Sequence, residues 1–192
     1  GSKDENLKTR IGEYLEKALR EAKRHSNWTG PNLDYEEKTV RFARQLLDPA
    51  RPFLKNFEEF HRKIADGGVL NSLAQVILKF TTPGVPDVYQ GCELWDLSLV
   101  DPDNRRPVDF EKRQRLVAEL EHQQNKEFVS ELWQNRFDGK IKLWLMQKLL
   151  SERKSSLKTL SEGHYIPLEV KGKLKNQVLA FARRFDQTWY IV

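Results

Sequence analysis

A stretch without helical periodicity, residues 82–109, separates two helix-like parts of the sequence. It combines several prolines and acidic residues with two glycines and the adjacent arginines Arg105 and Arg106. Proline ends or distorts a helix, so no single helix continues through this stretch. Regular elements do not need such a mixture, whereas loops that carry binding residues do. We therefore predict that the chain is organised around a long loop that forms part of a functional site.

The composition indicates a helix-rich protein with well-solvated faces. Charged residues make up 32% of the 192 residues, hydrophobic residues make up 39%, and the formal net charge is +5. Basic and acidic residues are mixed along the chain, so no basic stripe indicates a nucleic-acid partner. No apolar run approaches the ~18 residues of a membrane-spanning helix. The single cysteine, Cys92, excludes an intrachain disulfide and favours a reducing compartment, so we predict a cytoplasmic protein.

Apolar residues recur at helical spacing before the loop. They predict helices over residues 3–27, 34–48, 53–65 and 69–80. Asp34 with Glu37 resembles a capping box at the start of the second helix. The run Asp66-Gly67-Gly68 is expected to stop the third helix. One face of the third helix carries Phe53, Phe57, Phe60 and Ile64, and its three phenylalanines are assigned to the core.

After the loop, the period of the apolar residues changes at Gly163. Before this point the spacing predicts helices over 110–123, 126–134 and 141–153, and Trp133 and Trp144 are assigned to the core. Beyond it, alternating apolar residues predict antiparallel strands over 165–170, 177–185 and 188–192. Gly1-Ser2 resembles a cloning remnant. An apolar strand end at Val192 suggests that a β-domain continues past this residue.

The loop resembles the end of the catalytic barrel in the α-amylase family of glycoside hydrolases (family 13). In that family the last barrel strand carries a Gly-x-Pro-x-x-Tyr-x-Gly-x-Glu pattern, which is present here as Gly84–Glu93. The continuation, Leu94–Asp109, is similar to one branch of the family, the maltooligosyl trehalose synthases. The resemblance extends in the same order to Ala18–Lys23, Leu70–Gln75 and Tyr165–Val170. It therefore covers nearly the whole sequence.

The resemblance implies a domain plan. Residues 3–110 would form the end of a (β/α)8 barrel, with a last strand over 85–90 and an active-site loop over 91–109. Residues 111–162 would be a helical segment, and residues 163–192 would begin a C-terminal β-domain. A single βα unit cannot close a barrel. We therefore predict a mainly α fold with a small C-terminal antiparallel β-sheet, not a closed barrel.

The resemblance also implies an activity on α-glucans. The family's enzyme converts the reducing-end α-1,4 bond of a maltooligosaccharide into an α,α-1,1 bond by retaining intramolecular transglycosylation. Retaining chemistry needs a carboxylate nucleophile and a carboxylic general acid/base on either side of the bond. In the family these residues, with a third carboxylate, belong to motifs that precede the matched region. We therefore assign no catalytic residue to this chain and expect the isolated chain to be inactive.

Substrate-binding side chains are expected in the loop, because the loop after the last barrel strand lies at the catalytic face. Aromatic rings suit sugar faces, whereas carboxylates, amides and arginines suit hydroxyl groups. The candidates are Tyr89, Gln90, Glu93, Trp95, Asp101, Asp103, Arg105, Arg106 and Asp109.

Most of the candidates also have a purely structural interpretation. Tyr89 and Trp95 fit core aromatic residues equally well, and Glu93 fits a loop anchor. The run 101–107 fits internal ion pairing as well as a wall of sugar subsites, because Arg–carboxylate pairs are often bidentate.

No cofactor or metal is predicted, because the histidines are too scattered along the sequence to form a metal site. They are His25, His61, His122 and His164. The expected partner is a maltooligosaccharide, with no nucleic acid or membrane. The apolar faces of 69–80 and 85–90 would normally meet the rest of a barrel, so we also expect self-association.

Two other functions fit parts of the sequence. One is another α-amylase-family glucanotransferase or hydrolase, against which the run 95–109 argues. The other is a noncatalytic helical binding module, which leaves the proline- and arginine-rich loop without an explanation.

Overall fold

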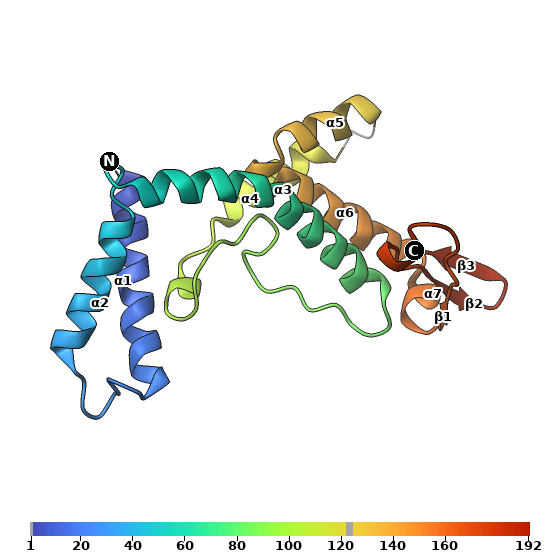
Figure 1. Cartoon of the computed structure of the whole chain (residues 1–192). Helices are drawn as coiled ribbons and strands as arrows, with labels where there is room; N and C mark the ends of the chain where they lie inside the picture. Colours follow the sequence, from blue (N-terminus) through green and yellow to red (C-terminus); the bar gives the residue numbers. More distant parts are fainter. Residues whose placement is uncertain (1, 122–124) are drawn as a thin grey trace. The chain divides into compact units, whose positions relative to one another are not determined.

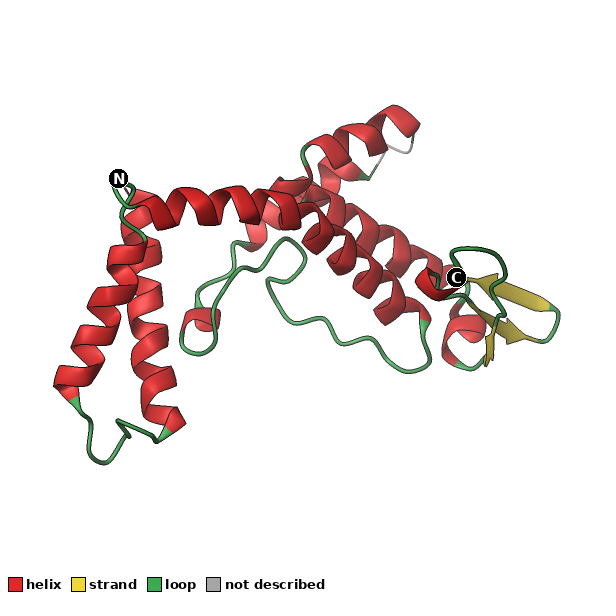
Figure 2. Ribbon diagram, in the orientation of Figure 1, coloured by secondary structure: helices red, strands yellow, loops and turns green. Residues whose placement is uncertain are grey.

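The computed structural model describes residues 2–121 and 125–192. Helices dominate the described chain, and the strands lie near its C-terminal end (Figure 1; Figure 2). The helices are α1 (Ser2–Ala22), α2 (Leu33–Leu46), α3 (Pro52–Thr81), η1 (Asp103–Arg105), α4 (Phe110–Leu120), α5 (Lys126–Gln134), η2 (Arg136–Asp138), α6 (Lys140–Ser155), α7 (Leu157–Ser161) and η3 (Lys175–Gln177). The strands are β1 (His164–Pro167), β2 (Phe181–Phe185) and β3 (Thr188–Ile191). The predicted mainly α fold with a small antiparallel sheet is confirmed.

One compact unit consists of the described residues up to Gly67 together with Leu97–Pro107. In this unit α1 and α2 pack side by side as an antiparallel pair (Figure 1). The two helices approach closely at Gly12, where a Cβ atom would lie 3.3 Å from the Val40 side chain. The unit also contains the first part of α3 and the short helix η1.

The second unit consists of Gly68–Asp96 and Val108–Val192. One buried cluster joins the loop to α4, α5 and α6 and contains Leu94, Leu116, Leu120, Phe128, Leu132, Ile141 and Leu143. Another joins α3 to α6 and contains Val76, Phe80, Met146 and Leu149. Because α6 contributes to both clusters, it is the central helix of this unit. Trp133 and Trp144 pack against the first cluster, as predicted.

The sheet has the order β1-β2-β3, and both pairings are antiparallel. The middle strand is the buried one: Phe181 and Ala182 are fully buried. Asp186, with a φ of +51°, lies in the tight turn between β2 and β3. All three strands are shorter than predicted, because 168–170, 177–180 and Val192 lie outside them. The pairing nevertheless extends past the strand ends, since the Leu168 amide donates to the Ala180 carbonyl at 3.0 Å.

The predicted helix stop at Asp66-Gly67-Gly68 is wrong. Helix α3 runs through both glycines, and neither has a positive φ. Glycine inside a helix costs about 1 kcal/mol relative to alanine, which weakens a helix without ending it. Burial of Val69 and Val76 on the following turns stabilises the continuous helix.

The predicted strand at 85–90 does not form. These residues follow an irregular path, and Val85 is 95% exposed. A strand needs a neighbour for its backbone groups. In the described part of the chain no strand pairs with this segment, and Pro86 has no amide hydrogen to donate.

The assignment of the phenylalanine face of α3 to the core is also wrong. Phe53, Phe57, Phe60 and Ile64 are each about half exposed. The rings of Phe53 and Phe57 stack on one another, with 5.9 Å between their centroids.

Two helix ends differ from the prediction. Helix α1 ends at Ala22, because Lys23 adopts a left-handed backbone with a φ of +53°. Helix α2 is capped by Asn32, whose side chain accepts a hydrogen bond from the Tyr35 amide, and not by Asp34. The predicted helix end at residue 123 lies outside the described residues.

Gly139 offers a test of the packing between the loop and α6. It has a φ of +85°, and a Cβ atom there would lie 3.0 Å from the Trp95 amide nitrogen and 3.2 Å from the Leu94 Cβ. Gly172 has a φ of +107°, and a Cβ atom there would meet nothing within 4 Å.

We expect Gly172→Ala to lower the free energy of unfolding by about 1 kcal/mol, the cost of a left-handed alanine. We expect Gly139→Ala to cost about 1–3 kcal/mol more, because the loop must move. Urea unfolding followed by circular dichroism measures both values, and equal losses would contradict the close approach.

Candidate functional site

Two arginines hold the end of α3 where the loop begins. Arg153 donates hydrogen bonds to the carbonyls of Phe80 (2.8 Å) and Gly84 (2.6 Å). Arg183, only 1% exposed, donates to the carbonyl of Thr81 at 3.0 Å and also to that of Gly163. The last carbonyls of a helix lack intrahelical partners and attract cations. The two arginines therefore fix the direction in which the loop leaves α3.

The next part of the loop presents Tyr89 and Gln90 to solvent, and Tyr89 is 56% exposed. Glu93 is tied down: its carboxylate accepts a hydrogen bond from Arg113 Nε at 2.8 Å. Arg113 also donates to the carbonyl of Gly91 at 2.7 Å. Glu93 is thus an anchor between the loop and α4, as the structural interpretation predicts.

Trp95 is held as a partly buried aromatic residue. Its Nε1 donates to the carbonyl of Arg136 at 2.6 Å, and the ring packs against the first buried cluster. The Lys142 ammonium lies 5.5 Å from the ring centroid and donates to the Leu94 carbonyl. Burial lowers the pKa of Lys142. These contacts favour the core interpretation of Trp95. The neighbouring Cys92 is a free, partly exposed thiol on the same loop.

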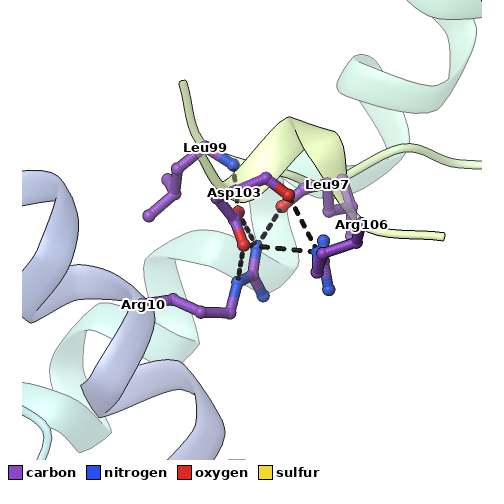
Figure 3. Close-up of polar contacts among 5 residues, drawn as sticks. All are labelled: Arg10, Leu97, Leu99, Asp103 and Arg106. Carbon is purple, nitrogen blue, oxygen red and sulfur yellow. Dashed lines mark hydrogen bonds and ion pairs between the residues drawn. The ribbon is translucent and has the colours of Figure 1, made fainter. Parts of the chain in front are cut away.

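Asp103 organises the remaining part of the loop, Leu97–Pro107 (Figure 3). Its carboxylate accepts hydrogen bonds from Arg10 Nε (2.9 Å), Arg10 Nη2 (2.7 Å) and the Leu99 amide (2.6 Å). Arg10 Nη2 also donates to the Leu97 carbonyl at 2.8 Å. The Asp103 residue is 8% exposed. The hydrogen bonds from Arg10 lower the pKa of this carboxyl group despite its burial, with smaller contributions from Leu99 and Arg106.

The other charged candidates also have partners within the chain. Arg105 Nε donates to Asp101 at 2.7 Å. Arg106 Nε donates to the Asp103 carbonyl at 2.9 Å and lies 3.3 Å from its carboxylate. Asp109 caps α4 by accepting a hydrogen bond from the Lys112 amide. Internal pairing of the run 101–107 is therefore present, and the side chains of Arg105 and Arg106 remain exposed.

The nine candidates fall into two groups. Tyr89, Gln90, Glu93, Trp95 and Asp109 belong to the second unit, whereas Asp101, Asp103, Arg105 and Arg106 belong to the first.

The sequence did not reveal two partners that hold these groups in place, Arg10 and Arg113. Both arginines lie on amphipathic helices, where a cation ordinarily marks only a solvated face. Nothing local in the sequence pairs Arg10 with a carboxylate 93 positions away.

A shallow open pocket lies beside Glu93 in the second unit. It is lined by Glu93, Phe110, Arg113, Gln114, Val117, Ala118, Glu121 and Leu143. Among residues 2–121 and 125–192, no group of His, Cys, Asp or Glu side chains is arranged to hold a metal ion. His122 lies outside these ranges. None of the helices in the described chain is long and apolar enough to cross a membrane.

Comparison with known proteins identifies one group of relatives. A protein of Mycobacterium tuberculosis provisionally named a maltooligosyl trehalose synthase is 34% identical over 180 residues, which are 94% of this chain and 21% of that protein. The chain is similar to maltooligosyl trehalose synthases. The resemblance found in the sequence is thereby confirmed, and the chain spans about a fifth of the length of its curated relatives. No family model matches it.

Solved structures of maltooligosyl trehalose synthases share the fold. A crystal structure of one such enzyme matches with a TM-score of 0.83 and 33% identity, over 93% of this chain and 23% of the other. A hypothetical maltooligosyl trehalose synthase from Sulfolobus tokodaii gives a TM-score of 0.77 and 36% identity over the same shares. The enzyme from Arthrobacter ramosus gives 0.76 and 29%, over 92% of this chain and 22% of that one.

Asp103 and Asp101 provide a matched pair for testing which carboxylate holds the loop. Asp103→Asn removes the charge from a buried carboxylate that accepts several hydrogen bonds. We therefore expect it to lower the free energy of unfolding by about 1.5–3 kcal/mol at neutral pH. Asp101→Asn changes an exposed pair and should cost less than about 1 kcal/mol. Urea unfolding of the three proteins at pH 7 measures these losses. Equal losses would contradict the special role of Asp103.

The stabilisation by Asp103 should also depend on pH. Its native pKa is lowered, so the native state binds fewer protons than the unfolded state. The stabilisation is therefore complete above the ordinary carboxyl pKa of about 3.9 and is lost as the pH falls through the lowered native value. The difference in unfolding free energy between the parent chain and Asp103→Asn should be constant near neutral pH and should shrink below about pH 4. A constant difference down to pH 2 would contradict this account.

Proposed function

We propose that this chain is part of a maltooligosyl trehalose synthase and corresponds to the C-terminal part of such an enzyme. The observation that carries the proposal is the fold match at a TM-score of 0.83 together with 33% identity over 93% of the chain. The complete enzyme would convert the reducing-end α-1,4 bond of a maltooligosaccharide into an α,α-1,1 bond by retaining intramolecular transglycosylation. Its place of action would be the cytoplasm.

The same proposal extends to the domain plan. Residues 3–110 would belong to the end of the catalytic barrel, 111–162 to a helical segment and 163–192 to the start of a C-terminal β-domain. The retaining reaction requires a pair of carboxyl groups, one on each side of the scissile bond. In our proposal these groups, and a third carboxylate, come from the part of the enzyme that the relatives have and this chain does not cover. The isolated chain would then be inactive.

The loop would form a wall of the glucan-binding site. Its exposed groups support this role: Tyr89 offers a half-exposed ring, and Gln90 offers an amide. Arg105 and Arg106 keep exposed side chains although each is paired with an aspartate. We propose that these four residues contact substrate directly. Glu93, Trp95, Asp101, Asp103 and Asp109 would shape the wall through their contacts within the chain.

A chimera tests the proposed function. The matching segment of the Mycobacterium tuberculosis relative would be replaced by this chain, and the same relative without the segment would be the control. With maltohexaose, we expect the chimera to remove reducing ends without releasing glucose, because the transfer is intramolecular. The isolated chain and the segment-deleted relative should show no reaction. A rise in reducing ends would favour a hydrolase, and a well-folded chimera without any reaction would favour a noncatalytic module.

Tyr89 provides the test of the loop wall within that chimera. Tyr89→Ala removes an exposed ring that packs against no buried cluster of the described residues. If the ring binds a sugar unit in ground and transition states alike, KM should rise about tenfold, equivalent to ~1.4 kcal/mol, with kcat unchanged. Phe137→Ala, which changes a similarly exposed ring on η2 outside the loop, is the matched control. The same KM for the parent chimera and Tyr89→Ala would exclude the contact.

A further inference from the structure

The turn between α1 and α2, residues 23–32, carries a tryptophan that is neither buried nor loosely held. Trp28 is 56% exposed. The guanidinium carbon of Arg20 lies over its ring at 5.1 Å from the centroid. Although Arg20 lies over the ring, more than half of the residue is exposed, so part of the indole surface is accessible to a ligand. We call residues 26–32 the Trp28 turn.

A buried carboxylate fixes the base of the Trp28 turn. Glu36 is 5% exposed and accepts hydrogen bonds from Arg20 Nε at 2.9 Å and Arg20 Nη2 at 2.8 Å. The Ser26 hydroxyl donates to the same carboxylate, and the Asn32 amide donates to the Ser26 oxygen at 3.0 Å. A buried carboxylate is costly unless it is paired and hydrogen-bonded. The same arginine therefore satisfies Glu36 and supports the Trp28 ring.

A second set of hydrogen bonds closes the top of the turn. The Asn27 Oδ1 atom accepts from the Thr29 amide at 3.0 Å, the Thr29 hydroxyl at 2.7 Å and the Gly30 amide at 2.8 Å. Asparagine side chains close turns in this way. The segment that carries Trp28 is therefore held from both ends, and the indole needs little further ordering when it binds a ligand.

The chemistry of the turn suits a sugar better than a protein. A protein interface buries about 1,200–2,000 Å² in total, far more than one short turn offers. A glucose ring instead needs one flat apolar surface for its C–H face and polar groups for its hydroxyls. The Trp28 turn supplies an indole that is flanked in sequence by Asn27 and Thr29. The hydrogen bonds that close the turn use the Asn27 oxygen and the Thr29 hydroxyl hydrogen, so the Asn27 NH2 donors and the Thr29 oxygen keep capacity for sugar hydroxyls.

We propose that the Trp28 turn is a binding subsite for an α-1,4-glucan, with the exposed part of the Trp28 indole stacked on a glucose unit. The proposal deepens the proposed function and rests on it for the identity of the sugar. The turn lies outside residues 82–109, in which all the sequence-based candidates were placed. The proposed subsite lies in the first unit, in a part of the chain that precedes the loop by about fifty residues.

The test is a titration of the 192-residue chain with maltohexaose, followed by the NMR signals of the tryptophan indole N–H groups. Trp189 is the internal control, because it is 47% exposed and has Arg184 over its ring at 5.0 Å but lies on strand β3. We expect the Trp28 signal to shift in a saturable way and the Trp189 signal to stay unchanged. Cellohexaose, with β-1,4 bonds, should shift the Trp28 signal less at equal concentration.

Three variants, Trp28→Ala, Trp28→Phe and Asn27→Ala, separate binding from folding. Because the Trp28 ring is exposed, Trp28→Ala should keep the circular dichroism spectrum, and calorimetry should show at least about tenfold weaker binding, equivalent to ~1.4 kcal/mol. Trp28→Phe keeps an aromatic face and should bind with intermediate affinity. Asn27→Ala releases the turn but keeps the indole, so it should weaken binding although the ring is still present.

The outcomes distinguish this proposal from the proposed function. No saturable shift of the Trp28 signal, or equal shifts of Trp28 and Trp189, would overturn the subsite, whereas the chimera could still be active. An unchanged affinity after Trp28→Ala in a folded chain would also overturn it. A saturable Trp28 shift with an inactive chimera would leave a glucan-binding turn and remove the enzyme assignment.

Discussion

The carbonyl oxygens at the C-terminal end of α3 impose the constraint on which the second unit depends. A helix leaves its last carbonyls without partners, and here they lie beside the core, where water cannot satisfy all of them. Arg153 and Arg183 supply the donors from α6 and β2. One set of hydrogen bonds therefore connects the central helix, the sheet and the start of the loop. This connection explains why an arginine with almost no exposure lies in the middle of a β-strand.

The loop that follows satisfies most of its charges internally. Glu93, Asp103 and Asp109 each use their carboxylates to hold the backbone or a neighbouring helix. An irregular segment has no ladder of its own, so its polar groups need side-chain partners. The acidic residues that make the sequence look like a binding site are thus the ones that give it a defined shape. Tyr89, by contrast, is exposed and is one of the residues that our proposed function assigns to substrate contact.

The sequence was informative where a local pattern determines the structure and uninformative where a distant partner does. Helical spacing located most helices, and alternation located the strands, because both patterns reflect one buried face. The prediction of a strand at 85–90 was wrong because a strand forms only where a neighbouring strand pairs with it. The predicted helix end at Gly67-Gly68 was wrong because tertiary packing overrides the low helix propensity of glycine. Likewise, the acidic residues of the loop were named as candidates from the sequence. Arg10 was not, because its partner Asp103 is distant in sequence.

The position of Cys92 has a practical consequence for observing this loop. It is the single cysteine of the sequence and lies, partly exposed, between the anchored Gly91 and Glu93. A thiol-reactive fluorophore or spin label will therefore attach at one position without prior removal of other cysteines. Because the residues on both sides are hydrogen-bonded to Arg113, the label will be attached at an anchored part of the loop backbone. The chain thus carries its own attachment point for spectroscopy that can show whether the loop responds to a glucan.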